Sequence, residues 1–254
     1  MKLLLSALVA LSFSVKVLAG DSSADGVVRK LSKRDQAAQR YMVEEPYEAP
    51  FGKLFNEEAY LAGETDLNQF VNVIVVNKSA SGPGAQTLRL YVNRQLVLTT
   101  KVSTGTEELE YISRFKRVIH SMTQGAKTSH WRHTSRGFYT VKRVYGDDYR
   151  SGESGYQMPY AMFFDDEHGL AVHQVPPDIA GGEAAAVAAL GSRASSGCVR
   201  VGGDYIRTIH DSVVAADKGQ IPVIDSKTGL QVVDAYGKPK FKVGYRSIVI
   251  VEDY

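Results

Sequence analysis

The sequence predicts a mainly β protein, a β-sandwich or barrel-like pair of sheets with one or two short helices near its functional site. Short runs rich in β-branched residues recur from residue 70 almost to the C-terminus, and turn-forming residues separate them. Helical periodicity is strongest in two segments of the second half of the chain. Many short strands with few helices are typical of sandwiches and barrels.

The residues before the first strand are expected to form an arm. Residues 21–50 are polar and charged, and short helices are expected over 35–42 and 56–61. We therefore assign residues 20–67 to an N-terminal arm or linker and residues 68–254 to one domain.

The predicted strands follow in chain order. Residues 70–76 are rich in valine and isoleucine. Residues 87–92 and 95–103 alternate between apolar and polar side chains on either side of Asn93-Arg94, which indicates a hairpin. Further short strands are expected over residues 138–144, 160–164, 170–175, 221–224 and 247–251.

Two helices are expected among the later strands, over residues 183–190 and 204–216. Asp204 is of a type that caps helix N-termini. The apolar face of the second helix is expected to carry Tyr205, Ile209 and Val213.

The first residues have the pattern of an export signal. Lys2 gives a basic start, residues 3–15 form an apolar run too short to span a bilayer comfortably, and Val17-Leu18-Ala19 suits signal cleavage. We expect residues 1–19 to be a signal peptide and the mature chain to begin near Gly20, in the periplasm or cell envelope. An uncleaved anchor is the alternative. No later stretch is apolar enough to form a membrane helix.

The charge balance argues against two classes of partner. The formal charge of +2 falls to zero when Lys2 and Lys16 leave with the signal peptide. A near-neutral protein has no bulk electrostatic attraction to nucleic acid or anionic lipid. We therefore expect no nucleic-acid partner, and no membrane span after signal removal.

The single cysteine, Cys198, cannot form an internal disulfide. A disulfide to another chain, a buried apolar role and a reactive thiol remain open. The context favours the thiol. Ser195, Ser196 and Gly197 are small and leave the sulfur approachable, and Arg200 places a cation nearby that favours the thiolate.

His173 ends a predicted buried strand and is a candidate base for that thiol. A thiol nucleophile needs an imidazole within hydrogen-bond reach and donors for the oxyanion, which the Gly197 and Cys198 backbone N–H groups would supply. No metal is needed. His130 and His133 have ligand-like spacing, but no carboxylate or cysteine cluster completes a zinc site, so we interpret them as solvated loop residues.

These residues resemble the signature of the L,D-transpeptidase catalytic domain, which has the YkuD-type fold. The signature is His173 followed by Ser195-Ser196-Gly197-Cys198-Val199-Arg200. Other segments also resemble parts of the family's fold: residues 88–97 the early hairpin, 102–105 the segment after it, 136–139 a strand beginning at glycine, and 158–164 the strand before the histidine. The resemblance covers roughly residues 70–252 and indicates that residues 68–254 are a catalytic domain.

Three features depart from the family's pattern. Ser196 stands where many members have histidine, which removes a second imidazole from the site. Thr134-Ser135 replaces the usual Thr-Pro. The interval between His173 and Cys198 is longer than usual, and its extra residues, 176–194, would form a lid or substrate wall, or a loop elaboration without a role.

The resemblance implies an acyl transfer on peptidoglycan stem peptides, without a cofactor, in cell-wall biogenesis and cell-shape maintenance. A cysteine thiolate attacks the carbonyl of the L-centre of the third stem residue, releases the terminal D-alanine and forms a thioester. An amine of a neighbouring stem then gives a 3→3 crosslink, and a free D-amino acid or a protein lysine gives acyl exchange or protein anchoring. The alternatives are an L,D-carboxypeptidase or endopeptidase with the same site, and a catalytically silent peptidoglycan-binding sandwich.

The resemblance also implies residue roles. Cys198 is the expected nucleophile, His173 the base, and the Gly197 and Cys198 amides the oxyanion hole, with Ser196 shaping the turn. Substrate contacts are expected from Ser195, Arg200 and Tyr160. Arg200 would bind a carboxylate or form a structural ion pair, and Tyr160 would line the donor pocket or pack in the core. The group that orients His173 is a backbone carbonyl or a small polar side chain.

Overall fold

The computed structural model describes residues 48–106, 132–152 and 154–254, and the helix expected over 35–42 lies outside them. Its strands are β1 Asn72–Asn77, β2 Thr87–Val92, β3 Gln95–Ser103, β4 Gly137–Thr140, β5 Arg143–Val144, β6 Met162–Asp165, β7 Leu170–Gln174, β8 Val199–Val201, β9 Lys218–Pro222, β10 Phe241–Tyr245 and β11 Ser247–Glu252. Its helices are α2 Glu57–Ala62, the 3-10 helix η1 Asp66–Gln69, α4 Glu183–Ala188 and α5 Gly203–Ala216.

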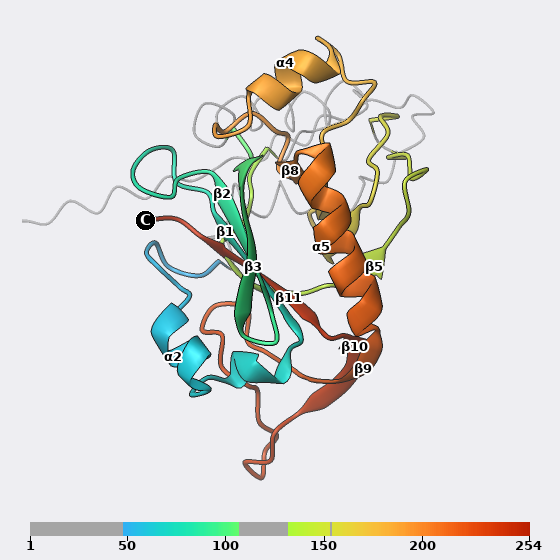
Figure 1. The fold of residues 1–254 in the computed structure, drawn as a ribbon. Helices are drawn as coiled ribbons and strands as arrows, with labels where there is room; N and C mark the ends of the chain where they lie inside the picture. The colour runs from blue at the N-terminus through green and yellow to red at the C-terminus, as the bar shows by residue number, and fades with distance from the viewer. Residues whose placement is uncertain (1–47, 107–131, 153) are drawn as a thin grey trace, which may run out of the picture. The chain divides into compact units, whose positions relative to one another are not determined.

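Within these residues, the strands form one curled sheet and a separate two-stranded ribbon (Figure 1). The order in the large sheet is β4-β11-β1-β2-β3-β8-β7-β6-β5, and the ribbon pairs β10 with β9. The sequence-based prediction of a mainly β fold with few helices is confirmed. The large sheet is mixed, because β1 lies parallel to β11 and β7 lies parallel to β8, while its other pairs are antiparallel.

Strand β1 is buried along its whole length because both of its faces are covered. The large sheet has a first half, β4-β11-β1-β2, and a second half, β8-β7-β6-β5, with β3 between them. Ile74 and Val76 face the main core, which strands of both halves share with α5. Val73 and Val75 face a second cluster on the other side. That cluster includes three buried residues from the part of the chain that the sequence assigns to an arm: Phe55, Tyr60 and Leu67.

The predicted hairpin is confirmed by β2 and β3. Asn93 and Arg94 both have positive φ, at 47° and 65°, as a two-residue turn that follows the twist of its strands requires. The far end of β3 then leaves β2 and pairs with β8, where Ser103 is opposite Arg200. Strand β3 thereby joins the two halves of the sheet.

The alternation of side chains along β6 and β7 decides which of them point away from the main core, to the outer face of the second half of the sheet. Successive side chains of a strand point to opposite faces. Phe164 and Val172 lie in the main core, whereas Phe163 and Ala171 lie in a third cluster together with Cys198. His173 follows Val172, so it lies on the same face as Ala171 and Cys198.

Helix α5 packs against β1 and β7 and runs beside the sheet in Figure 1. Its buried residues are Ile206, Ile209, Val213 and Ala216. The prediction for its apolar face is wrong for Tyr205, which is 46 % exposed, because the stripe begins one residue later. The capping prediction is also wrong: the N-cap is Gly202, and Asp204 lies in the first turn without a capping bond.

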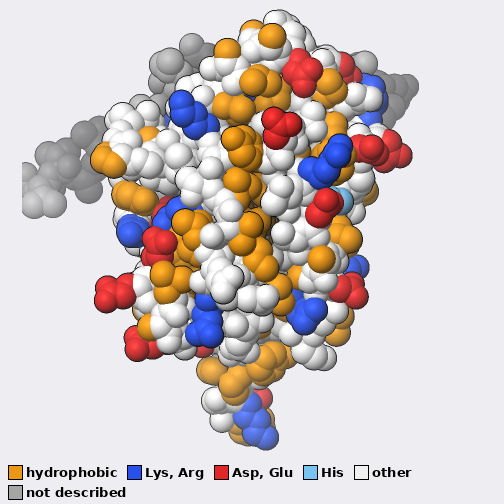
Figure 2. Space-filling model, in the orientation of Figure 1, with side chains coloured by type: hydrophobic (Ala, Val, Ile, Leu, Met, Phe, Trp, Pro, Cys, Tyr) orange, Lys and Arg blue, Asp and Glu red, His pale blue; other side chains and the backbone are white. Residues whose placement is uncertain are grey.

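Two other strand predictions need correction. The strand predicted over 138–144 is two strands, β4 and β5, which pair with β11 and β6. The strand predicted over 221–224 begins earlier, as β9, and pairs with β10. The two-stranded ribbon of β9 and β10 and the loop between them carry exposed apolar side chains. Figure 2 shows apolar and basic groups at the tip of this loop. Among the described residues, no helix has the length and apolarity needed to cross a bilayer.

Candidate active site

The loop that carries the cysteine, residues 191–198, runs into β8 and is called the Cys198 loop below. Thr104, the residue after β3, fixes the middle of this loop, because its carbonyl accepts the Ala194 and Ser195 N–H groups, both at 2.9 Å. Ser195 closes the turn: its hydroxyl donates to the Cys198 carbonyl at 2.5 Å and accepts the Gly197 N–H at 3.1 Å. Gly197 has φ +117°, a conformation that favours glycine.

The Cys198 thiol is half-buried and donates to the Gly169 carbonyl at 3.5 Å. It packs against a small apolar cluster whose buried members are Met158, Ala161, Phe163 and Ala171. The sulfur is therefore held at the outer face of β6 and β7, the face on which His173 lies.

His173 is almost completely buried, with 3 % of its surface exposed. A carbonyl only accepts hydrogen bonds, so the 2.5 Å contact between His173 Nδ1 and the Gln174 carbonyl places the proton on Nδ1. In the neutral ring, Nε2 is then the basic nitrogen. Of the two alternatives for the orienting group, the structure has the backbone carbonyl.

Burial also sets the charge of this imidazole. It lowers the pKa of His173 from 6.5 to about 4, an effect that the Gln174 hydrogen bond opposes and the positive charge of Arg200 reinforces. His173 is therefore uncharged at neutral pH and able to accept a proton.

Cys198 and His173 both line a cavity of about 240 Å³. They come together because β7 and β8 are parallel neighbours, with His173 opposite Arg200 and Cys198 immediately before β8. The other lining residues are Tyr149, Ser151, Gly152, Ser154, Tyr156, Met158, Phe163, Gly169, Pro176, Ser195, Ser196 and Arg200.

Arg200 brings a cation to this cavity. Its guanidinium donates to the Ala194 carbonyl at 3.1 Å, and no carboxylate of the described residues forms an ion pair with it. Burial lowers the pKa of Arg200; a thiolate at Cys198 acts in the opposite direction, and Arg132 lowers it further. Arg200 thus gives the cavity a positive charge beside the thiol.

The predicted site residues are only partly brought together. Ser195, Ser196 and Arg200 line the cavity, as do Cys198 and His173. Tyr160 is not among the lining residues. Its ring packs edge-on against His210 of α5 at 5.2 Å, and its hydroxyl accepts a hydrogen bond from Arg207 at 3.1 Å.

Two predictions about the loop change in detail. The Gly197 and Cys198 N–H groups were the expected oxyanion donors. The Gly197 N–H donates instead to the Ser195 hydroxyl, so the Cys198 N–H is the candidate donor. Ser195 uses its hydroxyl proton within the loop, on the Cys198 carbonyl, and so shapes the turn rather than offering that proton to a substrate.

Aromatic residues that the sequence did not single out form one wall of the cavity. Tyr149 stacks on Tyr145 with ring centroids 4.1 Å apart, and both rings meet Phe163 edge-on. Burial raises the pKa of Tyr149, and negative charge on Tyr145 or Cys198 raises it further. Tyr149 and Tyr156 belong to a glycine- and serine-rich loop without periodicity, so the sequence offers no signal for this wall.

The extra segment between His173 and Cys198 touches the cavity only at its beginning. Pro176 lines the cavity, whereas no residue of α4 does. The end of the segment is tied to β3, because the Ser103 hydroxyl donates to the Ala189 carbonyl at 2.8 Å. Helix α4 therefore flanks the site without forming its wall.

His133 lies in a different environment from the one expected. It is buried and pairs with Glu48, whose other carboxylate oxygen lies 3.2 Å from Arg136. Burial alone would raise the pKa of Glu48, but the hydrogen bond with His133 and the neighbouring positive charges outweigh it and lower the pKa. His130 lies outside the described residues, and within those residues no group of three or more histidine, cysteine or acidic side chains is arranged to hold a metal ion.

Comparison with known families finds a matching family model. The model of the YkuD family, described as the L,D-transpeptidase catalytic domain, matches residues 71–224. The match spans more than half of the chain and includes both His173 and Cys198. The chain belongs to this family.

Solved structures of L,D-transpeptidases also match at low sequence identity. A Mycobacterium tuberculosis enzyme is 16 % identical with a TM-score of 0.41, over 72 % of this chain and 58 % of that one. One from Mycobacterium smegmatis is 15 % identical with a TM-score of 0.37, over 72 % and 59 %. The catalytic domain of an E. faecium enzyme is 14 % identical with a TM-score of 0.36, over 71 % and 95 %. The chain thus spans just under three-fifths of the mycobacterial structures, and no curated protein matches it.

Proposed function

We propose that the protein is a cysteine-dependent L,D-transpeptidase that acts on peptidoglycan stem peptides. The observation that carries the proposal is the cavity that Cys198 and His173 share, which is lined by a thiol and by a buried, neutral imidazole whose Nε2 is basic. Thiol acyl transfer requires such a nucleophile and general base.

The first half-reaction is the acylation of Cys198. His173 Nε2 takes the thiol proton, and the sulfur attacks the carbonyl carbon of the third stem residue. The resulting oxyanion is stabilised by the Cys198 amide. When the tetrahedral intermediate collapses, the amide bond breaks, the D-alanine nitrogen receives the proton from His173, and a thioester remains on Cys198.

The second half-reaction transfers the acyl group. An acceptor amine loses its proton to His173 Nε2 and attacks the thioester carbonyl. The new amide forms as the carbon–sulfur bond breaks, and the proton returns from His173 to the sulfur. If the amine belongs to a neighbouring stem, the product is a 3→3 crosslink; a free D-amino acid gives an exchanged stem.

Arg200 is the proposed partner of a substrate carboxylate. Its guanidinium lies at the cavity without an acidic partner among the described side chains, and buried cations are stable when a carboxylate pairs with them. Stem peptides carry such carboxylates.

A carbapenem tests the thiol directly, and one neighbour, the transpeptidase LdtMt1, was solved in complex with imipenem. We expect imipenem to add one molecule to the purified protein, and peptide mapping to place it on Cys198. Cys198→Ala should give no adduct while keeping the wild-type melting temperature. An adduct that persists in this variant, or a wild-type protein that never forms one, would refute the assignment.

We further propose that the protein works in the periplasm or cell envelope after residues 1–19 are removed. Peptidoglycan lies outside the cytoplasmic membrane, and the first residues have the pattern of a cleaved signal. N-terminal sequencing of the native protein should begin at or next to Gly20. A cytoplasmic protein that starts at Met1 would contradict this.

A further inference from the structure

The Thr134 hydroxyl makes two hydrogen bonds, and one of them reaches the Cys198 loop. The side chain of Thr134 is fully buried. The Thr134 hydroxyl accepts the Gly105 N–H at 2.9 Å and donates to the Gly197 carbonyl at 2.6 Å. A single hydroxyl therefore connects Gly105, two residues after the end of β3, to the residue before the nucleophile.

The bond to Gly197 fixes the direction of the Cys198 amide. The Gly197 carbonyl and the Cys198 N–H belong to one planar peptide unit, and none of the described peptide bonds is cis. In a trans peptide the C=O and N–H groups point in opposite directions. By holding the carbonyl on one side, Thr134 sets the direction in which the Cys198 N–H points on the other.

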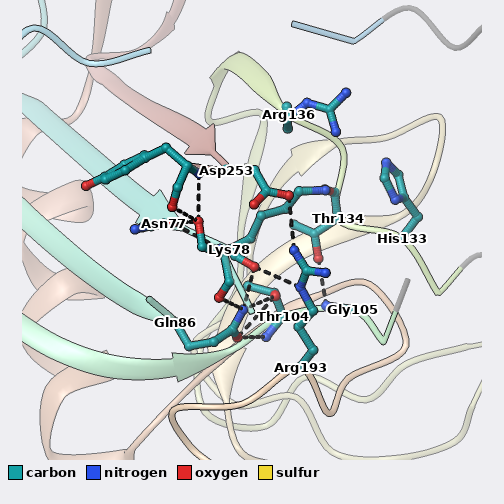
Figure 3. A network of polar contacts seen from close by, with 12 residues as sticks. Asn77, Lys78, Gln86, Thr104, Gly105, His133, Thr134, Arg136, Arg193 and Asp253 are labelled. Carbon is teal, nitrogen blue, oxygen red and sulfur yellow. Dashed lines mark hydrogen bonds and ion pairs between the residues drawn. The ribbon is translucent and has the colours of Figure 1, made fainter. Parts of the chain in front are cut away.

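A buried network holds Thr134 itself in place (Figure 3). The Lys78 ammonium, fully buried at the end of β1, donates to the Thr134 carbonyl at 2.7 Å. The Lys78 carbonyl accepts from Arg193 at 2.9 Å and from the Gln86 side-chain amide at 2.7 Å. Lys78 thus braces the Cys198 loop at two points, through Arg193 within the loop and through Thr134 at Gly197.

Close backbone approach makes this arrangement rigid. A side chain at Gly105 would put its Cβ 2.4 Å from the Arg132 carbonyl oxygen and 3.1 Å from the Thr134 nitrogen. Glycine at this position lets residues 132–134 pack directly on the end of β3, so Thr134 has little room to move.

We propose that Thr134 is a positioning residue, which orients the Cys198 amide as the oxyanion donor through its hydrogen bond to the Gly197 carbonyl. The inference rests on the proposed acyl transfer at Cys198. It assigns a function to a residue that acts through the backbone of the Cys198 loop. Its specific consequence is that Thr134 matters for reactions that form an oxyanion and not for the intrinsic reactivity of the thiol.

Two reagents separate these effects. Imipenem acylates a thiol through a tetrahedral oxyanion, whereas iodoacetamide alkylates it by direct displacement at carbon without one. We expect Thr134→Val to slow acylation by roughly 10- to 100-fold, below the ~10²–10³-fold loss found when an oxyanion donor is removed outright. Alkylation of Cys198 should stay within about twofold of wild type, because the sulfur and His173 keep their surroundings. Thr134→Ser, which keeps the hydroxyl, should restore most of the acylation rate.

Thr100→Val is the matched control, because it also removes a threonine hydroxyl. Among the described residues, the Thr100 hydroxyl makes only one hydrogen bond, a long 3.4 Å contact with the Lys101 carbonyl. This variant should leave both rates near wild type. Should Thr134→Val not fold, Thr134→Ala compared with Thr134→Ser gives the same contrast. Unchanged acylation in the hydroxyl-free variant would overturn the inference, as would a parallel loss of acylation and alkylation. A wild-type protein that forms no imipenem adduct would instead remove the proposed function and the inference with it.

Discussion

At the scale of the residue, His173 shows how burial prepares a side chain for chemistry. Water would leave an imidazole partly protonated near neutrality, but at 3 % exposure its charged form loses hydration. The Gln174 carbonyl then selects the tautomer with the proton on Nδ1. The result is a neutral imidazole at the cavity that Cys198 also lines, able to accept a proton.

The same burial predicts a pH-dependent stability. The unfolded chain protonates His173 near pH 6.5 and the folded chain only near pH 4, so protons bound between these values favour unfolding. The stability that depends on neutral His173 is complete above about pH 6.5. It is lost as the pH falls towards 4, by about 3 kcal/mol in total.

This prediction is checked by urea unfolding between pH 4 and pH 7. The free energy of unfolding of the wild type should decline more steeply with falling pH than that of His173→Gln, whose amide does not titrate in this range. The control is His210→Gln, which removes an imidazole that packs against Tyr160 and does not line the cavity, and it should keep the steeper decline of the wild type. Parallel curves for wild type and His173→Gln would show that His173 is not held neutral.

At the scale of the element, local sequence patterns made part of the fold predictable. The β2–β3 hairpin and the strand predicted over 170–175, which is β7, have local patterns, and both are confirmed. The pairing of β1 with β11 joins segments far apart in sequence, for which no local pattern exists. The same holds for Thr134 and Gly169, whose contacts with the Cys198 loop arise only when distant segments meet.

Non-periodic segments gave the least information. The aromatic wall at Tyr149 and Phe163 depends on how a loop folds over β6, which composition does not specify. For Tyr160 the structure favours the second of the two expected roles: it precedes β6 with φ +58° and packs against the main core and His210 of α5.

The contact between Gly105 and residues 132–134 gives a prediction at this scale. Gly105→Ala would bring a Cβ within 2.4 Å of the Arg132 carbonyl oxygen, a backbone atom that cannot rotate away. We expect a loss of about 1–3 kcal/mol in unfolding free energy, the usual range for overpacking, and slower acylation of Cys198. Thermal unfolding and imipenem kinetics measure the two effects.

Gly146→Ala is the matched control, since the nearest atom to its Cβ would be an Asp148 side-chain oxygen at 3.7 Å. It should change stability and acylation little. If Gly105→Ala behaved like Gly146→Ala, residues 132–134 would not be fixed by this contact.

At the scale of the whole molecule, the position of the site follows from the large sheet and from the segments that pack on its two faces. One face of β1 and β11 packs on the segment that contains Phe55 and Tyr60, and the other faces the core shared with α5. In the second half of the sheet, the cavity lies at the outer face of β6 and β7. Family membership and this arrangement lead to the same expectation, a thiol acyltransferase.

The central claim is that Cys198 and His173 carry out L,D-transpeptidation. The most direct measurement is mass spectrometry of tetrapeptide-containing muropeptides incubated with the purified protein. We predict 3→3 crosslinked dimers with wild type, none with Cys198→Ala, and a rate lower by roughly 10²–10⁴-fold with His173→Ala, the usual loss when a general base is removed. Crosslinked product from Cys198→Ala, or tripeptides without any dimer from the wild type, would contradict the account.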